Sequence, residues 1–152
     1  MNNIASEIKT IIESLGLIYL RCVNINDLNE QVGETSLLPG AGIYANVPSI
    51  SNETYATNAN VLMTYSIEIY FLRLNEYPDD NGEQIDLILD ATKQNAEDFI
   101  DVMKKSALIK SPNFIETYEL DAVETIKMSK EVLSGFQLSF DLPIYRADFF
   151  CP

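Results

Sequence analysis

The sequence predicts an α+β domain in which an antiparallel β-sheet with a long central strand packs against an N-terminal helix and one long helix. Residues 61–74 alternate between apolar and more mixed side chains, which is the pattern of a half-buried strand. Residues 3–15 and 83–105 instead repeat apolar side chains at helical spacing. The other strand-like segments come in sequence-adjacent pairs and do not alternate with helices, which favours an antiparallel sheet.

The N-terminal third begins with a helix that should end at Gly16, because glycine commonly adopts the left-handed conformation that terminates helices. The apolar residues that define this helix are Ile4, Ile8, Ile11, Ile12 and Leu15. A strand is predicted over 17–25. Turn-forming residues then dominate 26–60, where only 41–47 alternates as a short strand does. An irregular stretch of this length indicates a functional loop or an extended hairpin arm.

The long strand is followed by a turn over 75–82 and by the second predicted helix. The buried stripe of this helix is expected to consist of Ile85, Ile88, Leu89, Thr92, Ala96, Phe99, Ile100 and Met103. Two further strands are predicted over 114–123 and 135–145, and a short apolar tail covers 146–152. No repeat or linker divides the chain, so a single domain over 1–152 is expected.

The strand over 61–74, with the sequence VLMTYSIEIYFLRL, is unusually long, because most strands have about five or six residues. Its first face comprises Val61, Met63, Tyr65, Ile67, Ile69 and Phe71. Its second, more mixed face comprises Leu62, Thr64, Ser66, Glu68 and Tyr70. A strand of this length is expected to extend beyond its own core, where a partner chain can use it.

Length and composition describe a chain that can bury a core, with 152 residues of which 47% are hydrophobic. No apolar run is long enough to span a membrane, and the N-terminus has no signal-peptide pattern. A cytosol-like compartment without membrane contact is therefore expected. In such a reducing compartment Cys22 and Cys151 are predicted to be free thiols, with Cys22 buried as a small apolar residue.

The chain is acidic, since 10 basic and 23 acidic residues give a formal net charge of −13. This argues against tight nucleic-acid binding, because phosphate affinity comes mainly from Lys and Arg. An acidic surface fits a basic protein partner or simply water. The chain also has no histidine, and GAG at 40–42 lacks the spacing and the lysine of a phosphate-binding loop. We therefore predict no enzyme activity, no catalytic residue and no cofactor.

Acidic residues are concentrated in the turn before the second helix and along the helix itself. They are Glu76, Asp79, Asp80, Glu83, Asp86, Asp90, Glu97, Asp98 and Asp101. The glycine at position 82 does not fit an EF-hand calcium loop, so a turn and a helix N-terminus without a metal are expected there. The helix is then either a solvated amphipathic face or an electronegative surface that a polyanion passes without binding.

The order of these elements resembles that of the tail-terminator and tail-completion proteins of tailed phages. In that family an N-terminal helix and strand precede a loop with a hairpin, a long strand such as VLMTYSIEIYFLRL and one long helix such as EQIDLILDATKQNAEDFIDVMKK. The last strand opens with a small-Gly-aromatic step, as in LSGFQL at 133–138. The resemblance covers 4–145. The Asn- and Ile-rich sequence also suits phages of Bacteroides-type hosts, including crAss-like viruses.

The resemblance implies an architectural function in a virion that is assembled in the host cytoplasm. Such proteins form a homo-oligomeric ring, usually a hexamer and alternatively a dodecamer. The ring joins the tail tube to the head-side connector and to adjacent neck proteins, and DNA passes through it without specific binding. The implied contacts between subunits are Ile67, Ile69 and Tyr70 in the long strand and Phe149 and Phe150 in the tail. The two tail aromatics fit the chain's own core equally well.

The channel of such a ring would be lined with carboxylates, which repel DNA phosphates. The candidates are Asp79, Asp80, Glu83, Asp86 and Asp90. Two other functions remain open. An immunity or inhibitor protein would use the same acidic helix to cover a basic partner and would be a monomer alone. An enzyme that uses only carboxylates is the other, although 23 acidic residues make any single pair uninformative.

Overall fold

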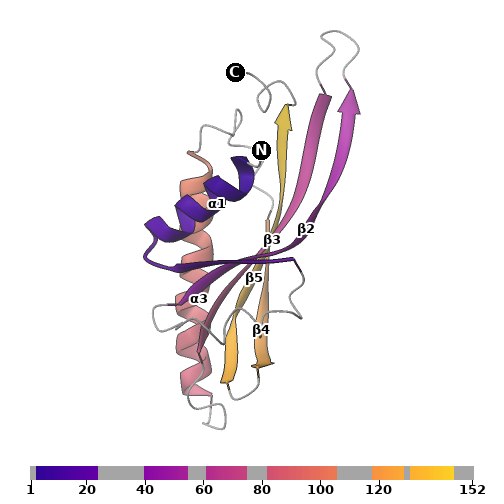
Figure 1. The fold of residues 1–152 in the computed structure, drawn as a ribbon. Helices are drawn as coiled ribbons and strands as arrows, with labels where there is room; N and C mark the ends of the chain where they lie inside the picture. Colours follow the sequence, from indigo (N-terminus) through magenta and orange to yellow (C-terminus); the bar gives the residue numbers. More distant parts are fainter. Residues whose placement is uncertain are drawn as a thin grey trace.

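The computed structural model describes residues 3–23, 40–54, 61–74, 82–105, 118–128 and 131–145, and the structural statements below concern these residues. They form a two-layer α+β fold (Figure 1). The elements in chain order are α1 (Asn3–Ser14), β1 (Ile18–Cys22), β2 (Ala41–Thr54), β3 (Val61–Leu74), α3 (Glu83–Met103), β4 (Tyr118–Met128) and β5 (Glu131–Tyr145). The predicted fold class and order of elements are confirmed.

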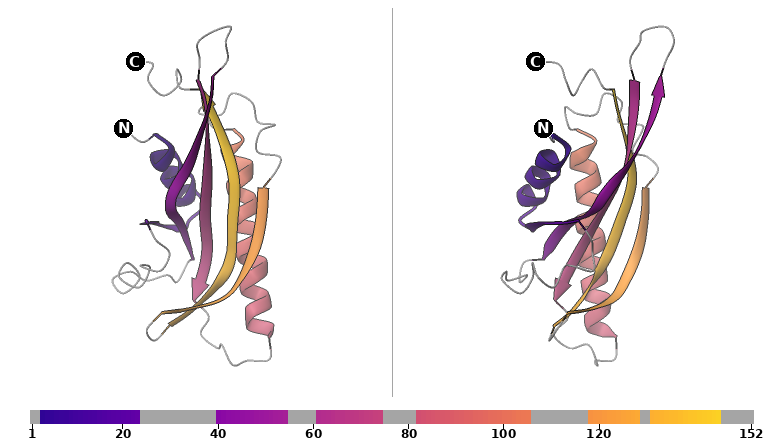
Figure 2. Two further views of the ribbon diagram at one scale, coloured as in Figure 1. Left: turned by 90° about the vertical axis from the view of Figure 1, so that its right-hand side faces the viewer. Right: turned by 45° about the vertical axis from the view of Figure 1, so that its right-hand side comes forward.

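The strands form one five-stranded sheet in the order β1-β2-β3-β5-β4, so the long strand β3 lies at its centre. All neighbouring strands are antiparallel except β1 and β2, which run parallel. Both helices cover the same side of the sheet, as the two views in Figure 2 show. Helix α1 contacts β1 and β2, whereas α3 lies against β3, β5 and β4. We call this side the helix face and the opposite side the far face.

Strand β3 has the bounds that the alternation predicts, residues 61–74. Strand β2 differs, because it extends to Thr54 while the sequence predicts a strand only over 41–47. Residues 49–54 carry mostly polar side chains, so hydrophobic periodicity does not mark them as a strand. They are a strand because each of them pairs with a residue of β3, which supplies a ladder of backbone hydrogen bonds.

Among the described strands of this mostly antiparallel sheet, β1 and β2 are the one pair that runs parallel. Ile18 lies opposite Ala41, and Cys22 lies opposite Ala45. Local pattern cannot distinguish the two directions, because a short apolar strand presents the same side chains in either case. The partner and its direction are therefore decided by the route of the chain.

Phe99 of α3 lies at the centre of the core between the helices and the sheet. Its ring centroid lies 5.8 Å from that of Phe71 in β3 and 6.2 Å from that of Phe140 in β5, in tilted arrangements that favour aromatic contact. The buried residues of α3 are Ile88, Thr92, Ala96, Phe99, Ile100 and Met103. This agrees with the predicted stripe, except that Ile85 and Leu89 are only half-buried.

Two glycines allow the layers and strands to approach closely. A Cβ atom on Gly135 of β5 would lie 1.9 Å from the carbonyl oxygen of Phe71, inside the backbone of β3. A Cβ atom on Gly42 of β2 would lie 2.8 Å from side-chain carbons of Ile12, so α1 rests directly on the β2 backbone. The first contact cannot relax by a side-chain movement, because it involves backbone on both sides.

A second apolar cluster lies on the far face. Its buried members are Cys22, Ala41, Ile43, Leu72 and Leu133. Cys22 is 1% exposed, in agreement with its prediction as a small buried residue. Alternation along β3 explains the cluster, because Phe71 enters the core on the helix face and Leu72 points to the opposite side.

Candidate assembly surface

The long strand β3 presents its two faces to different surroundings. Ile67 and Ile69 are 1% and 0% exposed and belong to the core beneath the helices. The family resemblance implies that both residues contact a neighbouring subunit, whereas in this fold their own chain covers them. Their side chains therefore stabilise the fold, and a contact between subunits at these positions stays a prediction.

Tyr70, on the far face of β3, is half-buried between its ladder partners Ile43 of β2 and Gln137 of β5. Burial raises the pKa of the Tyr70 phenol, and the nearby Glu68 carboxylate raises it further. Part of this side chain thus remains accessible to a partner. Four other predicted site residues lie outside the described part of the chain: Phe149, Phe150, Asp79 and Asp80.

One end of the sheet narrows to three strands, which we call the arm. It consists of residues 49–54 of β2, 61–66 of β3 and 141–145 of β5. Strand β1 pairs with β2 only as far as Ala45, and β4 pairs with β5 only as far as Phe140. The arm extends beyond α1 and α3 at the upper end of Figure 1. Strand β3 therefore passes its own core together with β2 and β5.

A β-bulge in β2 stands where the arm leaves the rest of the sheet. The register with β3 shifts between Ala45 and Ser49, and Asn46 has a left-handed backbone with φ 63°. Asparagine tolerates this conformation better than most residues. Its side-chain amide donates a hydrogen bond to the carboxylate of Glu68 on β3. Because bulges bend a strand and increase its twist, this position sets the direction of the arm.

Arg21 of β1 connects the bulge to the edge of the sheet. Its guanidinium donates hydrogen bonds of 2.8 Å to the carbonyl oxygens of Tyr44 and Asn46, and one of 3.1 Å to that of Cys22. The same group lies 4.0 Å from the centre of the Tyr44 ring, in a cation–π contact. Burial raises the pKa of Tyr44, although the positive charge of Arg21 acts in the opposite direction. One planar cation thus holds three backbone carbonyls.

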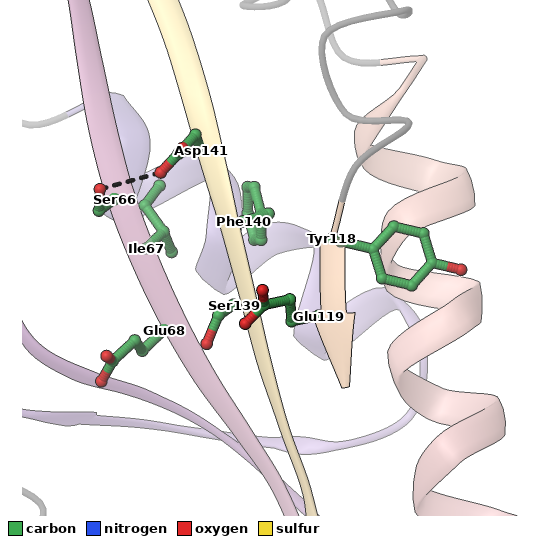
Figure 3. A pocket seen from close by; sticks show the side chains of 8 residues that line it. All are labelled: Ser66, Ile67, Glu68, Tyr118, Glu119, Ser139, Phe140 and Asp141. Carbon is green, nitrogen blue, oxygen red and sulfur yellow. Dashed lines mark hydrogen bonds between the residues drawn. The ribbon is translucent and has the colours of Figure 1, made fainter. Parts of the chain in front are cut away.

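Close to the arm the sheet carries a polar depression of about 520 Å³ (Figure 3). Its lining comes from β3, β4 and β5 and comprises Ser66, Ile67, Glu68, Tyr118, Glu119, Ser139, Phe140 and Asp141. The Ser66 hydroxyl donates a 2.9 Å hydrogen bond to Oδ1 of Asp141, which links β3 to β5. Three of the lining residues are carboxylates and none is a cation. The depression therefore suits a polar or positively charged contact.

A second acidic surface lies along α3, on the other layer of the molecule. Glu83, Asp86 and Asp90 are exposed there, on the side away from the buried stripe of the helix. Their spacing of three and four residues aligns them on the helix surface. Further along α3, Lys93 forms an ion pair of 4.0 Å with Glu97. The molecule thus carries acidic surfaces on both layers, of which the sequence predicts the one on α3.

The residues at the bulge are not identified from the sequence. Arg21 and Asn46 have hydrogen-bond partners 22 to 25 residues away, and no local motif marks such contacts. The position of Glu68 can be predicted in part, because the alternation of residues 61–74 places it on the mixed face of the strand. The same holds for Glu119, because it alternates with Tyr118 and Leu120, which are partly buried against the core. Alternation in the late strands could therefore have indicated the acidic far face.

Within the described ranges, no group of His, Cys, Asp or Glu side chains is placed to hold a metal ion. No helix in this part of the chain is long and apolar enough to span a membrane. Models of known protein families do not match the sequence, and curated protein sequences include no significant match to it.

Proposed function

We propose that this chain is a structural protein of a phage virion that forms a homo-oligomeric ring in the neck or tail. The ring, a hexamer or alternatively a dodecamer, would join the tail tube to the head-side connector and contact adjacent neck proteins. The arm carries this proposal, because its three strands extend past the helices that cover the core. A monomer gains little from a projecting sheet with open edges, whereas an assembly can use it for contacts between subunits.

The charge distribution supports the same function. A channel lined with carboxylates repels DNA phosphates and lets DNA pass without binding. Two surfaces are candidates for the lining, because Asp86 and Asp90 are exposed on α3 while Glu119 and Asp121 are exposed on β4. These surfaces belong to different layers of the molecule. Because every subunit of a ring has the same orientation, only one of the two surfaces can face the channel.

Electron microscopy of the purified protein, and of virions that contain it, tests the ring directly. We expect closed rings with a central channel and a mass of six or twelve copies of the 17.1 kDa chain. Tyr70→Asp places a charge on the half-buried far face and should weaken assembly, whereas Tyr70→Phe should not. A protein that stays monomeric at all concentrations and is absent from virions would overturn the proposal.

Two matched pairs of charge reversals locate the channel. Asp86→Lys with Asp90→Lys changes α3, and Glu119→Lys with Asp121→Lys changes β4 by the same total charge. All four positions are exposed, so the fold should tolerate both pairs. Only the pair that faces the channel should make assembled rings retain DNA, with an affinity that falls as salt rises. If neither pair changes DNA retention, the acidic channel is wrong.

An acidic immunity or inhibitor module is the second candidate function. The observation that favours it is the line of exposed carboxylates on α3, Glu83, Asp86 and Asp90. Such a module would be monomeric and would bind a basic protein tightly. The reversals Asp86→Lys and Asp90→Lys should then abolish binding, whereas those at Glu119 and Asp121 should leave it unchanged. Genes for portal, capsid or tail proteins beside this one would favour the ring, and a toxin gene would favour the module.

A further inference from the structure

We propose that the outer edge of β2 in the arm, residues 49–54, is a strand-addition site for the same segment of a second copy of this chain. The two segments would run antiparallel around a two-fold axis and join two arms into one continuous sheet. This contact does not depend on the proposed ring, because it belongs to the free protein and needs no other virion component.

The outer edge of β2 in the arm has no described strand beside it. Strand β1 pairs with β2 only over 41–45, and β2 continues for residues 49–54 with β3 alone as its neighbour. Along 49–54, therefore, no described strand pairs with the side of β2 that faces away from β3. Such an edge presents a row of N–H and C=O groups that can pair with another extended chain.

The other edges of the described sheet carry features that discourage pairing. Strand β1 is only five residues long. The outer strand β4 contains the acidic residues Glu119, Asp121 and Glu124, and its ladder is irregular between Val123 and Ile126. Short edge strands, charges and bulges are the means by which proteins protect sheet edges from association. These two edges are therefore poor partners for a second copy.

The arm edge of β5 is protected in another way. Pro143 has no backbone N–H and lies within the ladder, opposite Thr64 of β3. A ladder tolerates proline only where its nitrogen faces away from the neighbouring strand, so Pro143 removes a donor from the outer edge of β5. Asp141, two residues earlier, is exposed and adds a negative charge to this strand. The β5 edge is thereby blunted.

The segment 49–54 has little charge of its own. Residues 49–54 read SISNET, with no proline, no lysine and one acidic residue. In a chain with a net charge of −13, this is an edge where two copies can meet with little repulsion. Because the other edges are protected, the unprotected edge of a second copy is its own 49–54. A contact of a segment with itself is isologous, which gives a two-fold axis.

Sedimentation and hydrogen exchange of the full-length chain test this contact. Wild type should show a reversible monomer–dimer equilibrium, and amides of 49–54 should exchange more slowly as concentration rises. Ser51→Lys should raise the dimer Kd about tenfold or more, because the two-fold axis brings two new charges together. Ala122→Lys, at an exposed position of β4, adds the same charge to a protected edge and should leave the Kd unchanged.

A pair of proline variants separates loss of the contact from loss of the fold. In a β-strand, the N–H groups of two neighbouring residues point to opposite sides of the strand. Of the two variants Ile50→Pro and Ser51→Pro, one therefore removes an N–H group from the outer edge of β2. The other removes an N–H group that bonds to β3 and breaks that ladder. The outward variant should keep the thermal midpoint of the dilute monomer and lose dimerisation. The inference would be wrong if the dimer stayed intact in Ser51→Lys and in both proline variants. It would also be wrong if hydrogen exchange at 49–54 did not depend on protein concentration.

The outcomes also distinguish this inference from the ring. If wild type forms no dimer and its rings also assemble normally with Ser51→Lys, the arm contact is wrong and the ring stands. If the protein forms a dimer that Ser51→Lys weakens, but never forms rings and is absent from virions, the ring is wrong and the arm contact stands.

Discussion

The side-chain amide of Asn46 in β2 donates a hydrogen bond to the carboxylate of Glu68 in β3 at the point where the arm leaves the core. The carbonyl oxygen of Asn46 accepts a 2.8 Å hydrogen bond from Arg21 of β1. One residue is therefore held from both neighbouring strands, with its backbone in the left-handed region at φ 63°. The direction of the arm depends on these contacts, because the bulge in β2 is built around Asn46.

Replacement of Asn46 should separate the contribution of its backbone from that of its side chain. Asn46→Ala loses the hydrogen bond to Glu68. It also places alanine, which tolerates the left-handed region less well than asparagine, at a positive φ. Together these changes should lower the free energy of unfolding by about 1–3 kcal/mol. Asn46→Gly loses the hydrogen bond but removes the backbone strain and should cost less. Urea unfolding measures both. Equal losses for the two variants would show that the left-handed backbone contributes nothing.

Arg21→Lys should be destabilising although it keeps the charge. A lysine cannot reproduce a planar fork that reaches the carbonyls of Tyr44 and Asn46 while lying 4.0 Å from the Tyr44 ring centre. We expect a loss of about 1.5–3 kcal/mol in urea unfolding, since a hydrogen bond to a charged group contributes about that much. Lys93→Arg, on the exposed surface of α3, is the control and should be neutral. A neutral Arg21→Lys would mean that only the charge matters.

Gly135→Ala should disrupt the centre of the sheet. The added Cβ would lie 1.9 Å from the carbonyl oxygen of Phe71, so β3 and β5 must move apart. Overpacking typically costs about 1–3 kcal/mol, and backbone on both sides places this case at the upper end. Thermal unfolding measures the loss, with Ser139→Ala in the same strand as the control. A change below about 0.5 kcal/mol would show that the strands can separate without cost.

Stability should fall at alkaline pH because of buried phenols. Burial raises the pKa of Tyr19, Tyr44 and Tyr70 above the ordinary value of 10.0. The folded chain then holds these protons more tightly than the unfolded chain. Their contribution to the free energy of unfolding is fully present below the unfolded pKa and is lost as pH rises through the folded pKa.

Tyr44→Phe tests this expectation, because it removes one of the three ionisable groups and keeps the ring beside Arg21. Urea unfolding at pH 8 and at about pH 11 should show a smaller alkaline loss for Tyr44→Phe than for wild type. The absorbance of tyrosinate, followed in native and unfolded protein, measures the pKa difference directly. Parallel alkaline losses in the two proteins would contradict the assignment of this effect to Tyr44.

Several features could be predicted from the sequence because they are local. Alternation over 61–74 gave the bounds of β3, and helical spacing gave the stripe of α3 around Phe99. The exposed acids of α3, such as Asp86, follow from the same periodicity. These predictions succeed because side-chain direction within one element depends on that element alone.

Other features could not be predicted, because they depend on contacts between distant segments. Residues 49–54 form a strand only because β3 lies beside them. The burial of Ile67 and Ile69 in the core also depends on residues from several elements that pack together only in the folded chain. The need for glycine at position 135 likewise comes from the carbonyl of Phe71, more than sixty residues away.

The fold class, the long strand β3 and the acidic, histidine-free composition follow from patterns along the chain. The burial of one face of β3, the bend of β2 at Asn46 and the lack of a described neighbour on the outer side of 49–54 depend on how the segments fold together. The difference arises because period and charge are properties of neighbouring residues, whereas burial and strand pairing are properties of segments that meet only after folding.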